Sequence, residues 1–378
     1  MKKLVGLSLF SNVGVAEAGL SSLKDVDIVF ANELLEERAK FYTAVHPETQ
    51  MIQGDITNDE IRREIVHKAI DNSINFILAT PPCQGMSEAG LRYEFDKRNQ
   101  LITYVVDVIN RVKPLFAIIE NVPTILKTKI FVDGHVLLIP EYLKKFLPDY
   151  KFNEDSLIKA MDHGIPQMRE RNIYLLVRKD IDIQWGFPNK EAVITLRESI
   201  GHLPSLAPRL REGMDLTLQK FPDYYTKLET GLKISDWHFP PTHSWKQVEW
   251  MLHTPSGKSA IYNQKFFPQK EDGSRIKAHH NNYRRMSWDK PSRTITQNNG
   301  VISSLACVHP GRPYIEKNEV LYSDPRVLSI YELLIVSSLP LDWKIPSWAK
   351  ESFIRKVIGE GIPSRLITII IEELLKQL

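Results

Sequence analysis

Over roughly the first 180 residues, short apolar runs alternate with longer amphipathic segments, and this alternation most limits how the chain can fold. A short apolar run predicts a buried strand, and apolar residues at helical spacing predict a surface helix. Strands that are apolar on both faces favour a mostly parallel sheet with helices on both sides, a doubly wound α/β fold. The predicted strands are 4–10, 27–31, 75–80, 115–120 and 172–178, and the predicted helices are 15–23, 35–45, 59–69 and 98–112.

Polar or reactive residues follow several of these strands, at the point where each strand ends. Ligands of open α/β sheets bind beyond the carboxyl ends of the strands. A ligand site is therefore predicted where five stretches converge, namely 10–14, Glu33, Asp55, Pro82-Cys83 and Glu120-Asn121.

The composition changes near residue 184, and a chain of 378 residues has room for two domains. Up to about residue 320 the sequence is rich in Pro, Trp, Tyr, His, Lys and Arg, which predicts an irregular, β-rich second domain. Helical spacing returns over 362–378. The predicted division is a first domain at 1–183, a second at 184–320, a connecting region at 321–350 and a C-terminal helix at 351–378 that returns to the first domain.

Charge and cysteine content exclude several classes of protein. The net charge is 49 − 46 = +3, which permits a nucleic-acid partner without requiring one. The two cysteines, Cys83 and Cys307, lack metal-site spacing, so we expect no metal and a reduced, cytoplasmic setting. No apolar stretch is long enough for a membrane span, and the first 15 residues read as a buried strand rather than a signal peptide.

Cys83 stands in the stretch ATPPCQGMS, directly after a predicted strand. Most free cysteines are small core residues. Here Pro81 and Pro82 fix two φ angles before the thiol, and Gly85 opens a polar stretch that runs to Asn99. A rigidly held thiol beside a loop that can close suits nucleophilic catalysis.

Two further segments contain candidate catalytic residues. Glu120, in ENVP, lies at a predicted strand end, where burial would favour a protonated carboxyl and a role as general acid; a helix-capping or ion-paired glutamate is the alternative. In QMRER (167–171), Arg169 and Arg171 alternate and would share one side of an extended segment. They could form a solvated face or recognise an anion or carbonyl.

Together, these segments resemble the cytosine-C5 DNA methyltransferases. PPCQ (81–84) resembles the nucleophile motif of that family, ENV (120–122) its glutamate motif and QMRER its Gln-x-Arg-x-Arg motif, in the family's order. The segments 326–343 and 353–366 resemble its last two motifs. Each motif alone is weak, but the three in order are highly specific, and the resemblance covers most of the chain except the middle.

The resemblance implies S-adenosylmethionine as cofactor, with the segment 9–20 as its loop, Glu33 on the ribose, GDI (54–56) on the adenine and the segment 96–114 as the helix behind it. The chain departs from the family where Asn12 and Val15 replace glycines and where Glu360 replaces an asparagine. The implied cofactor residues are Phe10, Ser11, Asn12, Val13, Gly14, Glu33, Leu34, Asp55, Ile56, Pro82, Leu101 and Glu360.

The resemblance also implies a mechanism, in which Cys83 attacks C6 of a flipped-out cytosine and C5 then takes the methyl group. Glu120 would act at N3, and Arg171, supported by Arg169 and Gln167, would hold O2. Double-stranded DNA is the expected partner, read by the middle region. The candidate DNA contacts are Gln84, Ser87, Arg284, Arg285, Gln297 and Asn298.

Three other functions compete with this interpretation. RNA-methylating relatives usually carry Cys-Phe-Thr and a shorter middle, and catalytically dead relatives usually lose the cysteine or the glutamate; neither applies here. An NAD-dependent oxidoreductase would need GxGxxG and would leave PPCQ unexplained. A compact chain suggests a bacterial or phage modification enzyme, either paired with a restriction endonuclease or acting alone.

Overall fold

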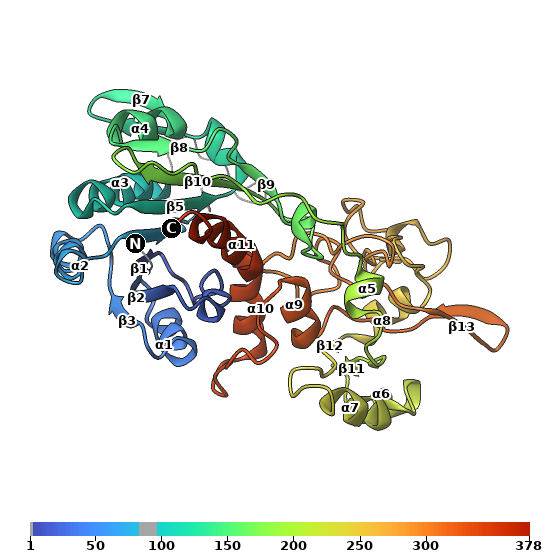
Figure 1. Cartoon of the computed structure of the whole chain (residues 1–378). Coiled ribbons are helices and arrows are strands. Elements are labelled where there is room, and N and C mark those ends of the chain that lie inside the picture. Colours follow the sequence, from blue (N-terminus) through green and yellow to red (C-terminus); the bar gives the residue numbers. More distant parts are fainter. Residues whose placement is uncertain (1–2, 83–96) are drawn as a thin grey trace.

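The computed structural model describes residues 3–82 and 97–378, and an eight-stranded sheet forms its centre (Figure 1). All five predicted strands are present, and β3, β8 and β9 are additional. The strands are β1 Leu4–Leu9, β2 Val26–Glu33, β3 Gln50–Gln53, β4 Phe76–Ala79, β5 Phe116–Asn121, β8 Tyr150–Phe152, β9 Leu157–Lys159 and β10 Glu170–Arg178. Neighbours follow the order β3-β2-β1-β4-β5-β10-β8, and β9 pairs with β10.

Strand direction confirms the mostly parallel α/β fold, with one informative exception. Strands β1 to β5 pair parallel to one another. Strand β10 runs antiparallel to β5, with Ile173 opposite Glu120. The start of β10, rather than its end, therefore lies at the carboxyl edge of the parallel strands, and this direction carries the segment 167–171 to the predicted site.

Side chains alternate between the two faces of the sheet, as the strand period of two requires. In β4, Ile77 and Ala79 share one core with α2, α3 and α4, whereas Phe76 and Leu78 share the other with α11. Helices thus cover both faces (Figure 1). The helices are α1 Glu36–Val45, α2 Asp59–Asp71, α3 Leu101–Val112, α4 Ile139–Phe146, α5 Leu196–Ile200, α6 Met214–Lys220, α7 Tyr224–Leu232, α8 Trp245–Leu252, α9 Ile330–Val336, α10 Glu351–Glu360 and α11 Ser364–Leu375.

The helix predicted at 15–23 is wrong. That stretch forms turns and a short 3-10 helix, Leu20–Ser22. Residues 15–18 and Leu20 are buried, Glu17 among them, so this part of the segment lies within the fold rather than on its surface, whereas Ser21 and Ser22 are exposed. A Cβ at Gly19 would meet Thr368 of α11 at 2.3 Å, so this close approach needs glycine. Tertiary packing here overrides the helical spacing of the sequence.

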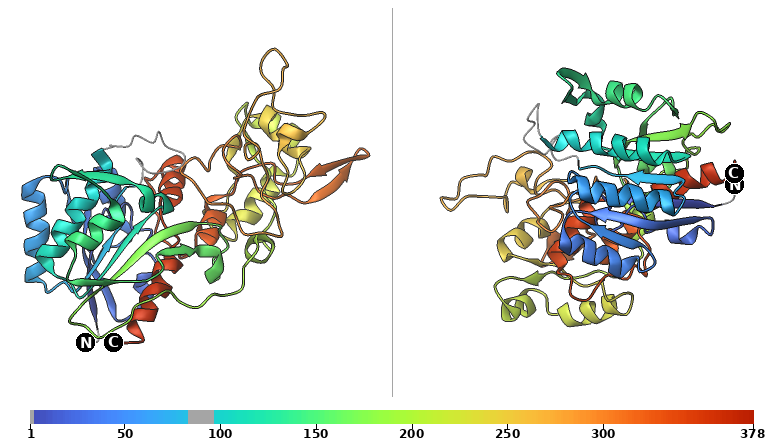
Figure 2. Two further views of the ribbon diagram at one scale, coloured as in Figure 1. Left: turned by 90° about the horizontal axis from the view of Figure 1, so that it is seen from above. Right: turned by 90° about the vertical axis from the view of Figure 1, so that its left-hand side faces the viewer.

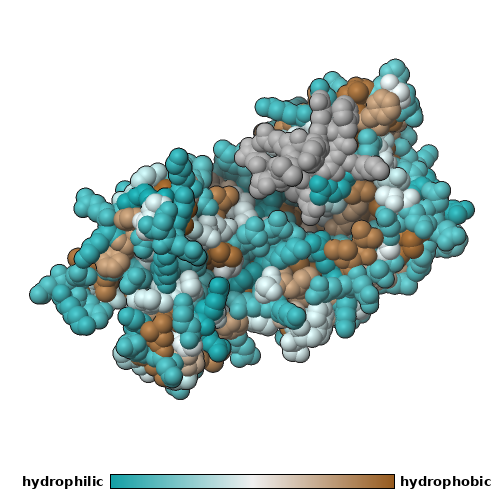
Figure 3. Space-filling view, turned by 180° about the vertical axis from the view of Figure 1, so that it is seen from behind, coloured by the Kyte–Doolittle hydropathy of each residue, from teal (hydrophilic) through white to brown (hydrophobic). Residues whose placement is uncertain are grey.

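The middle region lies beside the sheet-bearing part (Figures 1 and 2). It is irregular with small sheets, as predicted, and also carries α5 to α8. The face in Figure 3 is mostly hydrophilic, with apolar side chains scattered over it. The small sheets of the middle region pair β11 Arg209–Leu210 with β12 Thr242–His243 and β13 Pro313–Glu316 with β14 Glu319–Tyr322. A further two-stranded sheet, β6 Lys129–Val132 with β7 His135–Leu138, belongs to the first 183 residues.

The C-terminal helices join the two parts of the molecule. Residues of α11 share a core with the sheet. Residues of α9 and α10 share another core with Val13 and Val15, which follow β1, and with Leu196 and Trp288 of the middle region. Both termini end close together (Figures 1 and 2). Within the described residues, no helix has the length and apolarity to cross a bilayer.

Candidate active site

Hydrogen bonds between the ends of adjacent strands fix the carboxyl edge of the sheet. The backbone N–H of Ser11 donates to Asn32 O at 3.0 Å, and Thr80 donates from its hydroxyl to Phe10 O, also at 3.0 Å. The Asn121 amide donates to Pro81 O at 3.0 Å. The ends of β1, β2, β4 and β5 therefore meet, as the positions of their polar residues predicted.

The first loop, residues 10–14, follows β1 and turns sharply. Phe10, Asn12 and Gly14 have φ angles of 58°, 52° and 79°. Asparagine tolerates this left-handed region better than most residues, which explains why it can replace glycine at position 12. A Cβ at Gly14 would meet His46 Nε2 at 2.2 Å, so glycine is required there. The side chain of Val13 is fully buried and faces the core.

Glu33 at the end of β2 holds the first loop. Its carboxylate accepts the backbone N–H of Asn12 at 2.9 Å and that of Leu35 at 2.9 Å. The next residue, Leu34, leaves 53% of its surface exposed and thus offers an apolar surface beside the loop. After β3, Asp55 accepts the N–H of Thr57 at 2.9 Å, and Ile56 is buried in the core. Pro82 and Leu101, at the start of α3, are partly exposed.

Glu120 and Arg171 form an ion pair at this edge. Arg171 Nε lies 2.8 Å from Glu120 Oε1, and the side chains are 10% and 11% exposed. A charge at a buried strand end needs such a partner. Of the alternatives for Glu120, the ion-paired carboxylate is the one observed.

Gln167 and Arg169 make a different set of contacts. Both side chains are buried. Gln167 donates to Val336 O at 3.0 Å, and Arg169 donates to Ile295 O at 2.8 Å and to Glu360 O at 3.1 Å. These two residues therefore join the start of β10 to the middle region and to the C-terminal segment, while Arg171 pairs with Glu120.

The predicted DNA-facing residues divide into exposed and buried ones. Gln297 and Asn298 are exposed and Arg284 is partly exposed. The prediction for Arg285 is wrong, because this residue is fully buried and donates to Met251 O, His309 O, Tyr322 O and Asp324 O. Burial lowers the pKa of its guanidinium to about 9. Arg285 thus holds the middle region together and cannot reach DNA.

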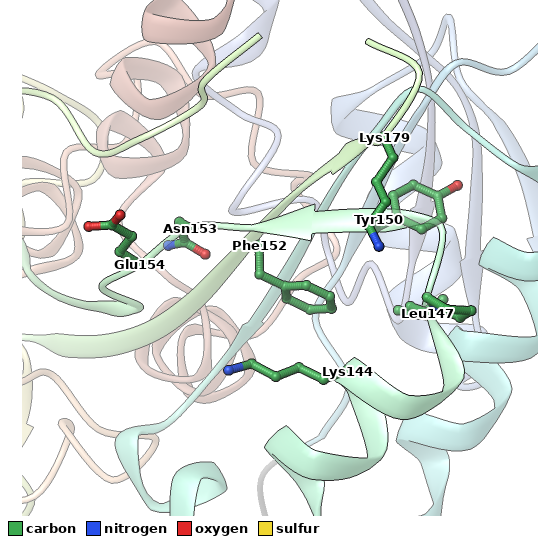
Figure 4. A pocket seen from close by; sticks show the side chains of 8 residues that line it. Lys144, Leu147, Tyr150, Phe152, Asn153, Glu154 and Lys179 are labelled. Atoms are coloured by element: carbon green, nitrogen blue, oxygen red, sulfur yellow. The ribbon is translucent and has the colours of Figure 1, made fainter. Parts of the chain in front are cut away.

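Cys83, Gln84 and Ser87 lie outside the described residues. The other cysteine, Cys307, is buried, and burial raises the pKa of its thiol to about 12, so it is a core residue. Within residues 3–82 and 97–378, no His, Cys, Asp or Glu cluster could hold a metal ion. The hollow in Figure 4 lies along β8 and α4, at the sheet edge remote from β3, and none of the predicted site residues lines it.

Sequence reasoning missed Arg38 and Glu17, two charged residues close to the first loop. Arg38 Nη2 lies 2.8 Å from Glu360 Oε2. Glu17 is fully buried under the loop and accepts a short hydrogen bond from the Ser8 hydroxyl. Neither residue belongs to a recognisable sequence motif, because its partner comes close to it only when the chain folds.

Glu17 predicts a pH-dependent stability. Burial raises the pKa of its carboxyl from 4.5 to about 7. Between these values the folded chain keeps a proton that the unfolded chain has released, so the free energy of unfolding falls as pH rises through this window. At about 1.4 kcal/mol per pKa unit the loss is on the order of 3 kcal/mol. Glu17→Gln should remove this slope in urea unfolding between pH 5 and 8.

The exposed Glu48 provides a matched control, because Glu48→Gln changes the same group on the surface and should keep the parental slope. Equal slopes in the parent and in Glu17→Gln would contradict the assignment of the proton to Glu17.

Comparisons with known proteins identify the family of the chain. The family model described as C-5 cytosine-specific DNA methylase matches residues 4–376. The Type II methyltransferase M1.HgaI of Avibacterium volantium is 39% identical over 382 residues, covering 100% of this chain and 99% of that protein. The Type II methyltransferase M.NgoPII of Neisseria gonorrhoeae is 32% identical over 53% of this chain and 57% of its own length.

Solved structures support the fold. A putative DNA modification methyltransferase encoded within a prophage of E. coli superposes with a TM-score of 0.66 at 21% identity, covering 99% of both chains. The S. pombe Dnmt2 methyltransferase gives 0.58 at 14% identity, over 100% of this chain and 99% of that one. The match to the family model over nearly the whole chain shows that this protein belongs to the C-5 cytosine-specific DNA methylase family and is a DNA methyltransferase of the restriction-modification type.

Proposed function

We propose that the protein transfers a methyl group from S-adenosylmethionine to C5 of a flipped-out cytosine in one short sequence of duplex DNA. The observation that carries this proposal is the Glu120–Arg171 ion pair at the same sheet edge as the first loop and Glu33. One carboxylate and one guanidinium that face a pyrimidine ring can stabilise charge at two of its polar atoms. Membership of the family makes this reaction the expected one, and the ion pair provides the carboxylate and the guanidinium that the reaction needs.

The residues of the first loop fit the cofactor. Gly14 has no side chain at the point where the loop turns, so the backbone is left uncovered there. The acceptor oxygens Asn12 Oδ1 and Glu360 Oε1 are buried and have no hydrogen-bond partner among the described residues. When bound, S-adenosylmethionine supplies an electrophilic methyl group. The residues that would hold it are Phe10, Ser11, Asn12, Val13, Gly14, Glu33, Leu34, Asp55, Ile56, Pro82, Leu101 and Glu360.

The protein's own residues would prepare the cytosine for methylation. The Cys83 thiolate adds to C6, which makes C5 nucleophilic, and Glu120 acts at N3 while Arg171 holds O2, where negative charge builds. Arg169 and Gln167 position this segment through their backbone contacts. After transfer, a base removes the C5 proton and the thiolate leaves. Because the stack hides these atoms in duplex DNA, the base must be flipped out.

The middle region, 184–320, is the proposed target-recognition domain, and 1–183 with the helices of 351–378 is the proposed catalytic domain. The shared core of α11 and the sheet supports the second assignment. Arg284, Gln297 and Asn298 remain candidate DNA contacts, together with Gln84 and Ser87. Side chains of these types can bind phosphates or base edges.

The biological role we propose is protection of DNA from a restriction endonuclease that acts independently, in the cytoplasm. Relatives named as Type II methyltransferases favour this role. A methyltransferase that acts without an endonuclease would carry the same residues.

Mapping 5-methylcytosine at base resolution tests the reaction. In a host that lacks cytosine methylation, the parent should methylate one short DNA sequence, and Cys83→Ala should give no methylation while still binding DNA. Absence of the thiol removes the nucleophile and leaves the rest of the site intact. Methylation by Cys83→Ala at the parental level would overturn the covalent mechanism, and methylation confined to RNA would overturn the substrate.

A further inference from the structure

A turn at residues 297–300 exposes two amide side chains between two buried isoleucines. Ile295 before the turn is 2% exposed and Ile302 after it is fully buried, and the two side chains belong to different cores. Between them, the side chains of Gln297 and Asn298 are exposed. The chain therefore leaves the interior for a few residues only, and both ends of this exposed stretch are fixed.

The next residue of the turn, Asn299, is buried instead. It is 2% exposed, and its side-chain Nδ2 donates to Thr296 O and to Arg355 O, both at 2.7 Å. An amide nitrogen has two N–H groups, so it can make both bonds at once. The first bond closes the turn on itself, and the second ties it to α10, which lies 56 positions further along the chain.

Helix α10, which lies where the two parts of the molecule meet, holds the turn from its own side (Figure 1). Arg355 is 4% exposed, and its Nη1 donates to Asn299 Oδ1 at 3.4 Å while its Nε pairs with Glu351 at 2.8 Å. A Cβ at Gly359 would lie 2.2 Å from Thr296 O, so the helix can approach the turn this closely only with glycine there. Both polar atoms of the Asn299 amide thus have partners, which fixes its orientation.

The exposed pair has the chemistry of a group that reads bases. Gln297 and Asn298 each carry one amide, which offers donors and an acceptor and can form two hydrogen bonds with a base edge. Because an amide is uncharged, its binding releases no counterions and adds little to general affinity for DNA. Loops that a rigid scaffold holds in place commonly carry binding residues, since a loop that is already ordered loses little entropy on binding.

We propose that Asn299 is a positioning residue for DNA sequence recognition, which fixes the turn 297–300 against α10 so that Gln297 and Asn298 meet base edges in one orientation. This inference rests on the proposed function and deepens it, because it assigns to these two candidate contacts the reading of sequence rather than the binding of phosphates. Arg355 supports the turn through Asn299 Oδ1. Loss of Asn299 therefore reduces discrimination between sequences and leaves the affinity for DNA in general unchanged.

Equilibrium binding to short duplexes tests the proposal without any turnover. The methylation map gives the parental site, and each further duplex changes one base pair of it. In Asn299→Ala, the ratio between the Kd of a changed duplex and that of the parental duplex should fall about 5- to 100-fold at the base pairs that the turn reads. Binding to unrelated DNA and its dependence on salt should stay parental, because no charge is lost. Parental ratios at every base pair would overturn the proposal.

The double variant Gln297→Ala/Asn298→Ala identifies the base pairs that the turn reads. If Asn299 acts through these two side chains, adding Asn299→Ala to the double variant should change the ratios at those base pairs by less than about 2-fold, whereas independent effects would multiply. A further loss by the full factor of the single variant would mean that Asn299 acts by another route and would exclude the positioning role.

Two more variants complete the test. Arg355→Met removes the donor to Asn299 Oδ1 but leaves the two bonds from Asn299 Nδ2 to backbone oxygens, so it should lower the same ratios by a smaller factor. Asn189→Ala, at an exposed asparagine after β10, is the matched control and should keep the parental ratios. Thermal unfolding shows whether each variant folds. If Asn299→Ala does not fold, parental ratios in a folded Arg355→Met would overturn the proposal.

The same measurements separate failure of this inference from failure of the proposed function. A parent that binds all duplexes equally would overturn the sequence-specific DNA substrate itself. A parent that discriminates between duplexes, together with a Gln297→Ala/Asn298→Ala variant that keeps every ratio, would leave the proposed function standing and overturn only the reading role of this turn.

Discussion

Glu120→Gln is expected to lower the rate of DNA methylation by about 10²- to 10³-fold, the effect of removing one charge-stabilising group from an active site. Glutamine keeps the size of the side chain and can still accept a hydrogen bond from Arg171, but it can neither carry the negative charge nor hold the proton that the cytosine ring needs. The rate is measured in single turnover with a labelled methyl group on duplex DNA that contains the parental site. Thermal unfolding shows whether the variant remains folded.

Asp180→Asn is the matched control for this prediction. Asp180 pairs with Arg178 at the other end of β10, at 2.6 Å, and its side chain is 58% exposed. The substitution removes the same kind of charge from an ion pair just after β10, away from the sheet edge that carries the site, and should leave the methylation rate unchanged. A parental rate in Glu120→Gln would show that this carboxylate takes no part in the chemistry.

Arg326→Met is expected to produce the largest loss of stability, about 3–5 kcal/mol, because it leaves buried carboxylates without their counter-charge. Arg326 lies 2.7 Å from Glu332 and 2.9 Å from Asp324, and all three side chains are at most 1% exposed. Burial opposes ionisation of Glu332, yet the Arg326 guanidinium lowers the pKa of this carboxyl to about 2. The free energy of unfolding is measured in urea at pH 7.

The same pair predicts a loss of stability in acid. The folded pKa of Glu332 lies below its ordinary value of 4.5, so its stabilising contribution is complete above that value and disappears as pH falls toward 2. Arg326→Lys keeps a positive charge and should unfold at higher urea than Arg326→Met. Arg197→Met, which breaks an exposed pair with Asp289, should keep the parental midpoint. A parental midpoint in Arg326→Met would contradict the role of the buried cluster.

The sequence by itself located five of the eight sheet strands to within about two residues at each end, and with them the polar residues that follow these strands. Runs such as 75–80 and 115–120 are apolar on both faces, and a segment of that kind has few stable alternatives to a covered strand. Since parallel strands share one carboxyl edge, the positions of Glu33 and Glu120 in the sequence already predicted that both would lie at that edge of the sheet. The order of the three motifs identified the family.

Only the tertiary structure decided how these segments are held. The stretch 15–23 has helical spacing but forms turns and a short 3-10 helix. Arg285 is of a residue type that often contacts DNA, but its guanidinium donates to four carbonyl oxygens inside the protein. The contact between Asn12 and Glu360 joins the two ends of the chain. Local residues set the conformations that a segment prefers, whereas burial and the partner of a charge depend on which distant segment packs against it, and that is fixed only when the whole chain folds.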